Sequence, residues 1–157
     1  MANVRVQAEG FDAGREGAAL ARGRGDVGAV VTFVGYCRDE GGTLAALEIE
    51  HFPGMAEAEI KRVAADAEAR WPLLGLTVVH RFGRIKAGEP IVLVATASAH
   101  RGDAFAAAEM LMDFLKARAP FWKRAIGVDG VARDWVEAKD ADHVAAAQWS
   151  AAERRSR

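Results

Sequence analysis

The sequence predicts an α+β fold, in which helices mix with strands that include antiparallel pairs. Along the chain the apolar residues switch several times between the two-residue period of strands and the three- to four-residue period of helices. The turn-like residues 86–90 lie between two strand-like runs, which favours a hairpin-type unit. Because a hairpin requires antiparallel pairing, we expect α+β rather than a purely parallel sheet.

The first half of the chain is expected to alternate between helices and strands. Residues 13–28 mix Gly and Ala with Arg and Glu, which predicts a short helix followed by a loop. Residues 27–34 are an apolar, β-branched run of strand length, and residues 44–52 alternate like a half-exposed strand. Residues 55–71 carry apolar side chains at helical spacing, and we expect this helix to stop before Pro72.

The middle of the chain predicts two strands and a long helix. The strands are expected at residues 76–82 and 91–97. Ser98 is the expected N-cap of a helix over residues 99–118, since a Ser side chain accepts a hydrogen bond from the first helical turn. Pro120 should end that helix, because proline disfavours helical geometry in the residue before it.

The last part of the chain predicts a turn, a strand and a helix. Asp129-Gly130 marks the turn and residues 135–138 a short strand. The alanine-rich residues 144–152 predict a final helix that frays into a polar tail from about residue 150. With 157 residues, 51% of them hydrophobic, we interpret residues 1–157 as one domain with its own core.

Charge and hydropathy exclude several classes of protein. The 21 basic and 22 acidic residues give a formal net charge of −1, so a general nucleic-acid-binding protein is not expected. No apolar run approaches the roughly 20 residues of a membrane span, and the N-terminus has no signal-like apolar region. We therefore expect no membrane association and a cytoplasmic location.

Several motifs resemble functional sites without meeting their structural requirements. The glycines from Gly23 to Gly28 match G-x-G-x-x-G, but they precede a strand, whereas a dinucleotide site must follow one. Ser98, His100 and Asp103 lie within two turns of one helix start, where they cannot form a catalytic triad. No two histidines have a metal-ligand spacing and Cys37 is the single cysteine, so we expect no metal and a buried, unreactive thiol.

Five cationic residues stand at the ends of predicted elements, where sites commonly form. Arg38 follows the first apolar strand, and His100-Arg101 open the long helix, whose N-terminus attracts anions. Lys116 and Lys123 flank its end, beside Phe121-Trp122. Two interpretations remain open from spacing alone: cations that complement the helix C-terminus in solvent, or an anion-binding pocket with an aromatic wall and a lysine of lowered proton affinity.

Beyond these positions, the sequence resembles the MoaE family, the large catalytic subunits of molybdopterin synthase, from about Gly28 to Trp149. The matching segments are residues 28–35 (GAVVTFVG) with Arg38, 47–55 (LEIEHFPGM), 70–72 (RWP), 80–83 (HRFG), 98–101 (SAHR) and 119–124 (APFWKR). The resemblance implies an α+β fold with an α/β-hammerhead-like region and an additional antiparallel β subdomain. So many short matches in one order make it far more specific than the glycine pattern.

The resemblance implies a sulfurtransferase of molybdenum cofactor biosynthesis. A small ubiquitin-like carrier subunit would present a thiocarboxylate on its C-terminal Gly-Gly, and two sulfurs would pass in turn to cyclic pyranopterin monophosphate to form the dithiolene of molybdopterin. The family forms a homodimer of large subunits within a heterotetramer, and no resident cofactor is implied. The lone Cys37 fits sulfur that is delivered by a partner.

By the same resemblance, each candidate site residue has a role. Lys116 would contact the thiocarboxylate, and Lys123 would act as acid or base or stabilise developing charge. The substrate-binding residues would be Arg38, His100, Arg101 and Lys139, with Lys139 near the position of a basic residue from the neighbouring large subunit.

One departure from the family pattern bears on catalysis. The family commonly carries Glu where this chain has Ala125, so either that Glu is dispensable or Asp129 or another acid substitutes for it. Ala125 supports an alternative function, a non-catalytic anion- or nucleotide-binding homodimer that retains the pocket. A third hypothesis is a scaffold for a ubiquitin-like partner.

Overall fold

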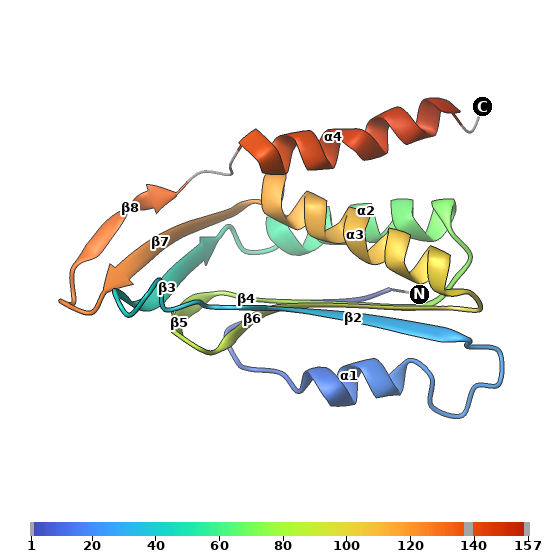
Figure 1. Cartoon of the computed structure of the whole chain (residues 1–157), viewed down its shortest axis with the longest axis horizontal. Helices are drawn as coiled ribbons and strands as arrows, with labels where there is room; N and C mark the ends of the chain where they lie inside the picture. The colour runs from blue at the N-terminus through green and yellow to red at the C-terminus, as the bar shows by residue number, and fades with distance from the viewer. Residues whose placement is uncertain (1, 137–139, 156–157) are drawn as a thin grey trace.

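The structure is a computed structural model that describes residues 2–136 and 140–155, arranged as two sheets and four helices (Figure 1). The elements, in chain order, are β1 (Asn3–Gln7), α1 (Ala13–Ala19), β2 (Ala29–Tyr36), β3 (Leu44–His51), α2 (Met55–Arg70), β4 (Leu73–Arg81), β5 (Gly83–Lys86), β6 (Pro90–Ser98), α3 (Arg101–Ala117), β7 (Phe121–Gly127), β8 (Ala132–Val136) and α4 (Asp140–Arg155). The mixture of helices with largely antiparallel strands confirms the α+β prediction.

The main sheet has the strand order β1-β4-β6-β2. β1 pairs with β4 in parallel, whereas β6 is antiparallel to both β4 and β2. Helices α2 and α3 cover one face and α1 the other (Figure 1), so β4 and β6 are buried almost throughout. The antiparallel pairing of β4 with β6 confirms the predicted hairpin-type unit.

The second sheet is fully antiparallel, has the order β5-β3-β7-β8, and stands at one end of the main sheet (Figure 1). The chain passes from β4 in one sheet to β5 in the other through Phe82 and Gly83. Gly83 has φ +88°, a conformation that favours glycine. In the pairing of β3 with β7, His51 lies opposite Phe121 and Ile49 opposite Lys123, so this sheet sets the position of a predicted site lysine.

Three strands were not predicted because tertiary pairing, rather than local pattern, creates them. β1 and β5 have only five and four residues and carry charged side chains among apolar ones. β7 contains the adjacent cations Lys123 and Arg124, which from the sequence read as a charged segment after Pro120. β8 lies at Ala132–Val136 rather than at 135–138, of which residues 137 and 138 lie outside the described residues.

The helices agree with prediction except at their ends. α3 has His100 as its N-cap instead of Ser98, which is the last residue of β6. Ser98 Oγ donates to the Pro72 carbonyl oxygen at 3.1 Å and accepts from the His100 N–H at 3.5 Å, so it links the strand to the helix start. α4 begins at Asp140, four residues before the predicted range. In the described part of the chain, no helix has the length and apolar character of a membrane span.

Candidate active site

Lys116 and Lys123 come together at the C-terminal end of α3. Lys116 is in the last turn of the helix, which ends at Ala117, and the chain reverses through Pro120 into β7, where Lys123 is the third residue. Both lysines line an outer cavity of about 410 Å³ and an inner cavity of about 60 Å³. The structure thus places the two predicted catalytic residues at the boundary of two adjoining cavities.

The outer cavity lies between β7, β8, the end of α3 and the start of α4. Phe121 and Trp122 contribute to its wall, as the sequence predicted, and Val136 adds an apolar side chain from β8. Asp142 and His143 on the first turn of α4 also line it. Neither residue was predicted as part of the site, because nothing local in the sequence indicates that α4 returns to the lysines.

The inner cavity lies between the main sheet and α3. Phe33 and Tyr36 from β2 and His80 from β4 line it together with the lysines. Tyr36 is exposed, whereas His80 is almost completely buried. His80 was missed as a site residue, although it belongs to the HRFG segment that carries part of the family resemblance.

Of the two lysines, Lys123 has a side-chain amine with a strongly shifted pKa. Its burial, together with the nearby Lys116 charge, lowers the pKa of Lys123 to about 8, and the Asp142 carboxylate partly opposes this shift. An amine with a pKa near neutrality can exchange a proton during a reaction, whereas an ordinary lysine stays charged. The arrangement can therefore bind an anionic acyl group and transfer a proton at the same place.

Arg38 lies at the same end of the molecule as the lysines. It follows β2 by two residues, and Tyr36 at the end of that strand lines the inner cavity. The Arg38 side chain is 80% exposed and approaches Glu40 at 3.6 Å. Arg38 is thus a solvated cation near the cavities rather than part of their walls.

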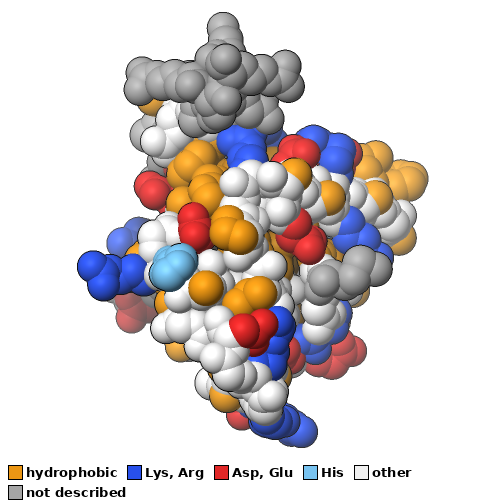
Figure 2. Space-filling model, turned by 90° about the vertical axis from the view of Figure 1, so that its right-hand side faces the viewer, with side chains coloured by type: hydrophobic (Ala, Val, Ile, Leu, Met, Phe, Trp, Pro, Cys, Tyr) orange, Lys and Arg blue, Asp and Glu red, His pale blue; other side chains and the backbone are white. Residues whose placement is uncertain are grey.

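His100 and Arg101 lie at the opposite end of α3 and do not meet the lysines within this chain. Lys116 is fifteen positions after Arg101 on the helix, which corresponds to about 22 Å along the axis. Both residues are exposed. The face at this end carries acidic and basic side chains interspersed rather than one continuous basic patch (Figure 2).

The remaining candidates are placed as follows. Lys139 lies outside the described residues. Ala125 lies on β7 opposite Leu47, and Asp129 is in the β7–β8 turn, where it pairs with Arg133 at 2.9 Å. Asp129 therefore does not replace the family glutamate beside the lysines, whereas Asp142 places a carboxylate on the outer cavity.

The motifs set aside in the sequence have structural roles. Gly23 to Gly28 lie in the segment that leads into β2, and a Cβ on Gly28 would stand 2.1 Å from the Ala99 carbonyl oxygen. Cys37 is 1% exposed, and its burial raises the pKa of the thiol, which makes it unreactive. Among the described residues, no three His, Cys, Asp or Glu side chains are grouped as metal ligands.

Together, the α+β fold and the two lysines that line adjoining cavities define a class of protein with a cationic pocket, in which one amine has a pKa near neutrality. The chain belongs to the MoaE family, whose family model, described as MoaE protein, matches residues 6–118. It is 62% identical over 146 residues to the molybdopterin synthase catalytic subunit of Mesorhizobium japonicum, covering 93% of this chain and 92% of that one.

Solved structures agree with this assignment. The MoaE protein from Burkholderia ambifaria superposes with a TM-score of 0.80 at 46% identity, covering 96% of this chain and 99% of that one. The molybdopterin synthase from Staphylococcus aureus superposes with a TM-score of 0.73 at 29% identity, covering 83% of this chain and 94% of that one.

Proposed function

We propose that this chain is the catalytic subunit of a molybdopterin synthase. It transfers sulfur from the C-terminal thiocarboxylate of a small carrier subunit to cyclic pyranopterin monophosphate, which yields the dithiolene of molybdopterin. The observation that carries the proposal is the lysine pair at the junction of two cavities, with the pKa of Lys123 lowered to about 8. Family membership and the names of the relatives support the same activity.

The two lysines have complementary roles in this reaction. Each transfer forms a carbon–sulfur bond on the pterin side chain and breaks a carbon–oxygen bond there, whose oxygen leaves with the phosphate or as water. The carbon–sulfur bond of the thiocarboxylate breaks at the same time, and water supplies the oxygen of the regenerated carboxylate. Lys116, exposed in the outer cavity, binds the anionic carrier terminus. Lys123 donates a proton or stabilises the negative charge that develops as the carbon–sulfur bond breaks.

The substrate phosphate requires a second copy of the chain. His100 and Arg101 are about 22 Å of helix axis from Lys116, too far to bind the same small molecule within one chain. In a homodimer, the N-terminal end of α3 of one subunit completes the lysine cavities of the other, with Arg38 at the rim. Lys139, outside the described residues, is proposed as a further cation of the composite site.

In this proposal the chain acts as one domain in the cytoplasm. Its partners are the carrier subunit and a second copy of itself, and together they form a heterotetramer. Neither nucleic acid nor a membrane takes part, in keeping with the net charge of −1.

A reconstitution assay tests the function directly. The purified chain is incubated with thiocarboxylated carrier and cyclic pyranopterin monophosphate, and molybdopterin is detected. The same carrier ending in an ordinary carboxylate is the control and should give no product. If the chain binds both partners but yields no molybdopterin, the non-catalytic binding homodimer, which Ala125 favours, is the correct function instead.

A further inference from the structure

His80 is a buried titratable residue beside the lysines that has no role in the mechanism above. It lies on β4, is 2% exposed, and lines the inner cavity together with Lys116 and Lys123. A polar ring in such a position costs free energy unless its nitrogens are used. The way the ring is held indicates what its free nitrogen does.

The orientation of the His80 ring is determined by two contacts. The ring stacks on Phe121 at 3.9 Å between centroids and 13° between planes. Its Nδ1 lies 2.8 Å from the Arg81 carbonyl oxygen. Because a carbonyl oxygen only accepts, Nδ1 must carry the hydrogen, and the lone pair is on Nε2.

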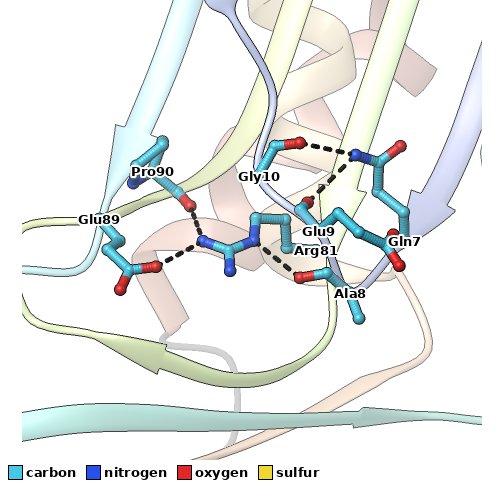
Figure 3. Close-up of polar contacts among 7 residues, drawn as sticks. All are labelled: Gln7, Ala8, Glu9, Gly10, Arg81, Glu89 and Pro90. Atoms are coloured by element: carbon cyan, nitrogen blue, oxygen red, sulfur yellow. Dashed lines mark hydrogen bonds and ion pairs between the residues drawn. The ribbon is translucent and has the colours of Figure 1, made fainter.

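The Arg81 carbonyl that selects this tautomer is itself held firmly. The Arg81 guanidinium donates to the Glu89 carboxylate and the Pro90 carbonyl oxygen, both at 3.0 Å, and to the Ala8 carbonyl oxygen at 3.1 Å (Figure 3). Its backbone lies in β4, which pairs with β1 on this side. A ring hydrogen-bonded to such a rigid group has little freedom to flip or change tautomer.

Lys123 faces the same space as His80. Phe121 and Lys123 are two residues apart on β7, so their side chains project from the same face of the strand, and Phe121 is the ring on which His80 stacks. Among the described residues, neither the Lys123 amine nor His80 Nε2 has a hydrogen-bond or ion-pair partner. Both groups line the inner cavity.

We propose that His80 is a positioning residue for Lys123. Its Nε2 lone pair accepts a hydrogen bond from one water molecule in the inner cavity, and that water accepts a hydrogen bond from the Lys123 side-chain nitrogen; a cavity of about 60 Å³ is sufficient for it. The bond directs the amine towards the boundary of the two cavities. This inference rests on the proposed role of Lys123 in sulfur transfer.

The surrounding charges keep His80 suited to this role. Burial and the charges of Lys123, Lys116 and His51 lower the pKa of His80 to about 3, so it stays a neutral acceptor near neutral pH. The other groups that face Lys123 are Lys116 from α3 and Asp142 from α4, both on the outer cavity. A neutral acceptor holds the amine in both of its protonation states, since ammonium and amine each have a hydrogen to donate.

Paired substitutions test the proposal by activity. His80→Met removes the acceptor, and we expect kcat to fall about 10- to 100-fold, with KM for the carrier nearly unchanged and the pKa of Lys123 lowered further. His80→Gln retains an acceptor oxygen and should keep kcat within about threefold of wild type. His51→Met is the matched control, because His51 also packs near Phe121, at 6.1 Å, but lines neither lysine cavity. Equal kcat values for the Met and Gln variants of His80 would overturn the proposal.

Nuclear magnetic resonance on the wild-type chain gives a test that needs neither a variant nor turnover. The ¹⁵N shifts of His80 should show hydrogen on Nδ1 and a hydrogen-bonded lone pair on Nε2. Hydrogen on Nε2 in the wild type would refute the inference even if the enzyme is active. A chain that makes no molybdopterin but shows the expected shifts would refute the proposed function alone.

Discussion

At the C-terminal end of α3, Lys116 meets Lys123 of the neighbouring strand, while at the N-terminal end His100 and Arg101 stand side by side in solvent. Two potential cations lie at each end of the helix. At the C-terminal end one of them, Lys123, belongs to a strand and is half-buried, whereas both residues at the N-terminal end are exposed. β7 holds Lys123 half-buried, and the pKa of its amine falls to about 8 as a result.

The difference in burial between the two ends of α3 suits one end to proton transfer and the other to anion binding. A covered amine can gain or lose a proton near neutral pH and can take part in a reaction step. An exposed arginine at a helix N-terminus keeps its charge and, with the free N–H groups there, is suited to hold a phosphate. The two ends of α3 therefore predict different kinetic consequences when their residues are removed.

The largest effect is expected at the lysine end. Lys116→Ala should lower the rate of molybdopterin formation by at least about 100-fold, because the carrier terminus loses the cation that it meets. The fold should persist, since an exposed Lys→Ala change in a helix costs little. Lys61→Ala, which removes an exposed lysine on α2, is the matched control and should leave the rate unchanged. Wild-type turnover by the Lys116 variant would remove this residue from the mechanism.

The second prediction tests whether the two ends of α3 serve one site. Arg101→Ala should weaken pterin binding by about 1.5–3 kcal/mol, the cost of a charged hydrogen bond, as measured by calorimetry. If the site is shared between subunits, mixing Lys116→Ala chains with Arg101→Ala chains restores one intact site in each mixed dimer. Random exchange should then recover about a quarter of wild-type activity. Mixtures that are no more active than the average of the separate variants would show that the site lies within one chain.

The contrast between the two ends also explains what the sequence could predict. The α3 range, the cation pairs at its ends and the Phe121-Trp122 wall follow from periodicity, Pro120 and local residue types. The burial of Lys123 does not, because it depends on β7 pairing with β3 more than 70 residues earlier in the chain. For the same reason no apolar period or turn signal placed His80 of β4 or Asp142 of α4 at the cavities of the lysines, although His80 belongs to a segment of the family resemblance.

The third prediction concerns how much the half-buried Lys123 amine lowers the free energy of unfolding. Lys123→Met should raise the free energy of unfolding at pH 7 by on the order of 1–2 kcal/mol, after allowance for solvent that reaches the amine. The folded pKa of about 8 is below the ordinary 10.5, so the folded state holds this proton less firmly than the unfolded state. Wild-type stability therefore gains relative to the variant as pH rises from 8 to 10.5.

Urea denaturation of both proteins across this pH range measures the effect. The advantage of the Met variant should be full below pH 8 and nearly gone by pH 10.5. Lys61→Met, at an exposed position, should show no such pH dependence. A constant difference between Lys123→Met and wild type at all pH values would mean that Lys123 is not destabilised by its surroundings.

The smallest effect is expected at Arg38, which shares the exposure of Arg101 but lies at the lysine end. Its side chain is 80% exposed, so it should attract anionic substrates over a distance rather than contact them. Arg38→Ala should raise KM about two- to fivefold at low salt with kcat unchanged, and the effect should vanish at high salt, where such charges are screened. Arg15→Ala, on α1 across the main sheet, should have no effect at either salt concentration. A larger rise in KM that persists at high salt would instead mean that Arg38 binds the substrate directly. In that case, the exposure of a side chain in the free chain would not distinguish residues that attract the substrate from residues that bind it.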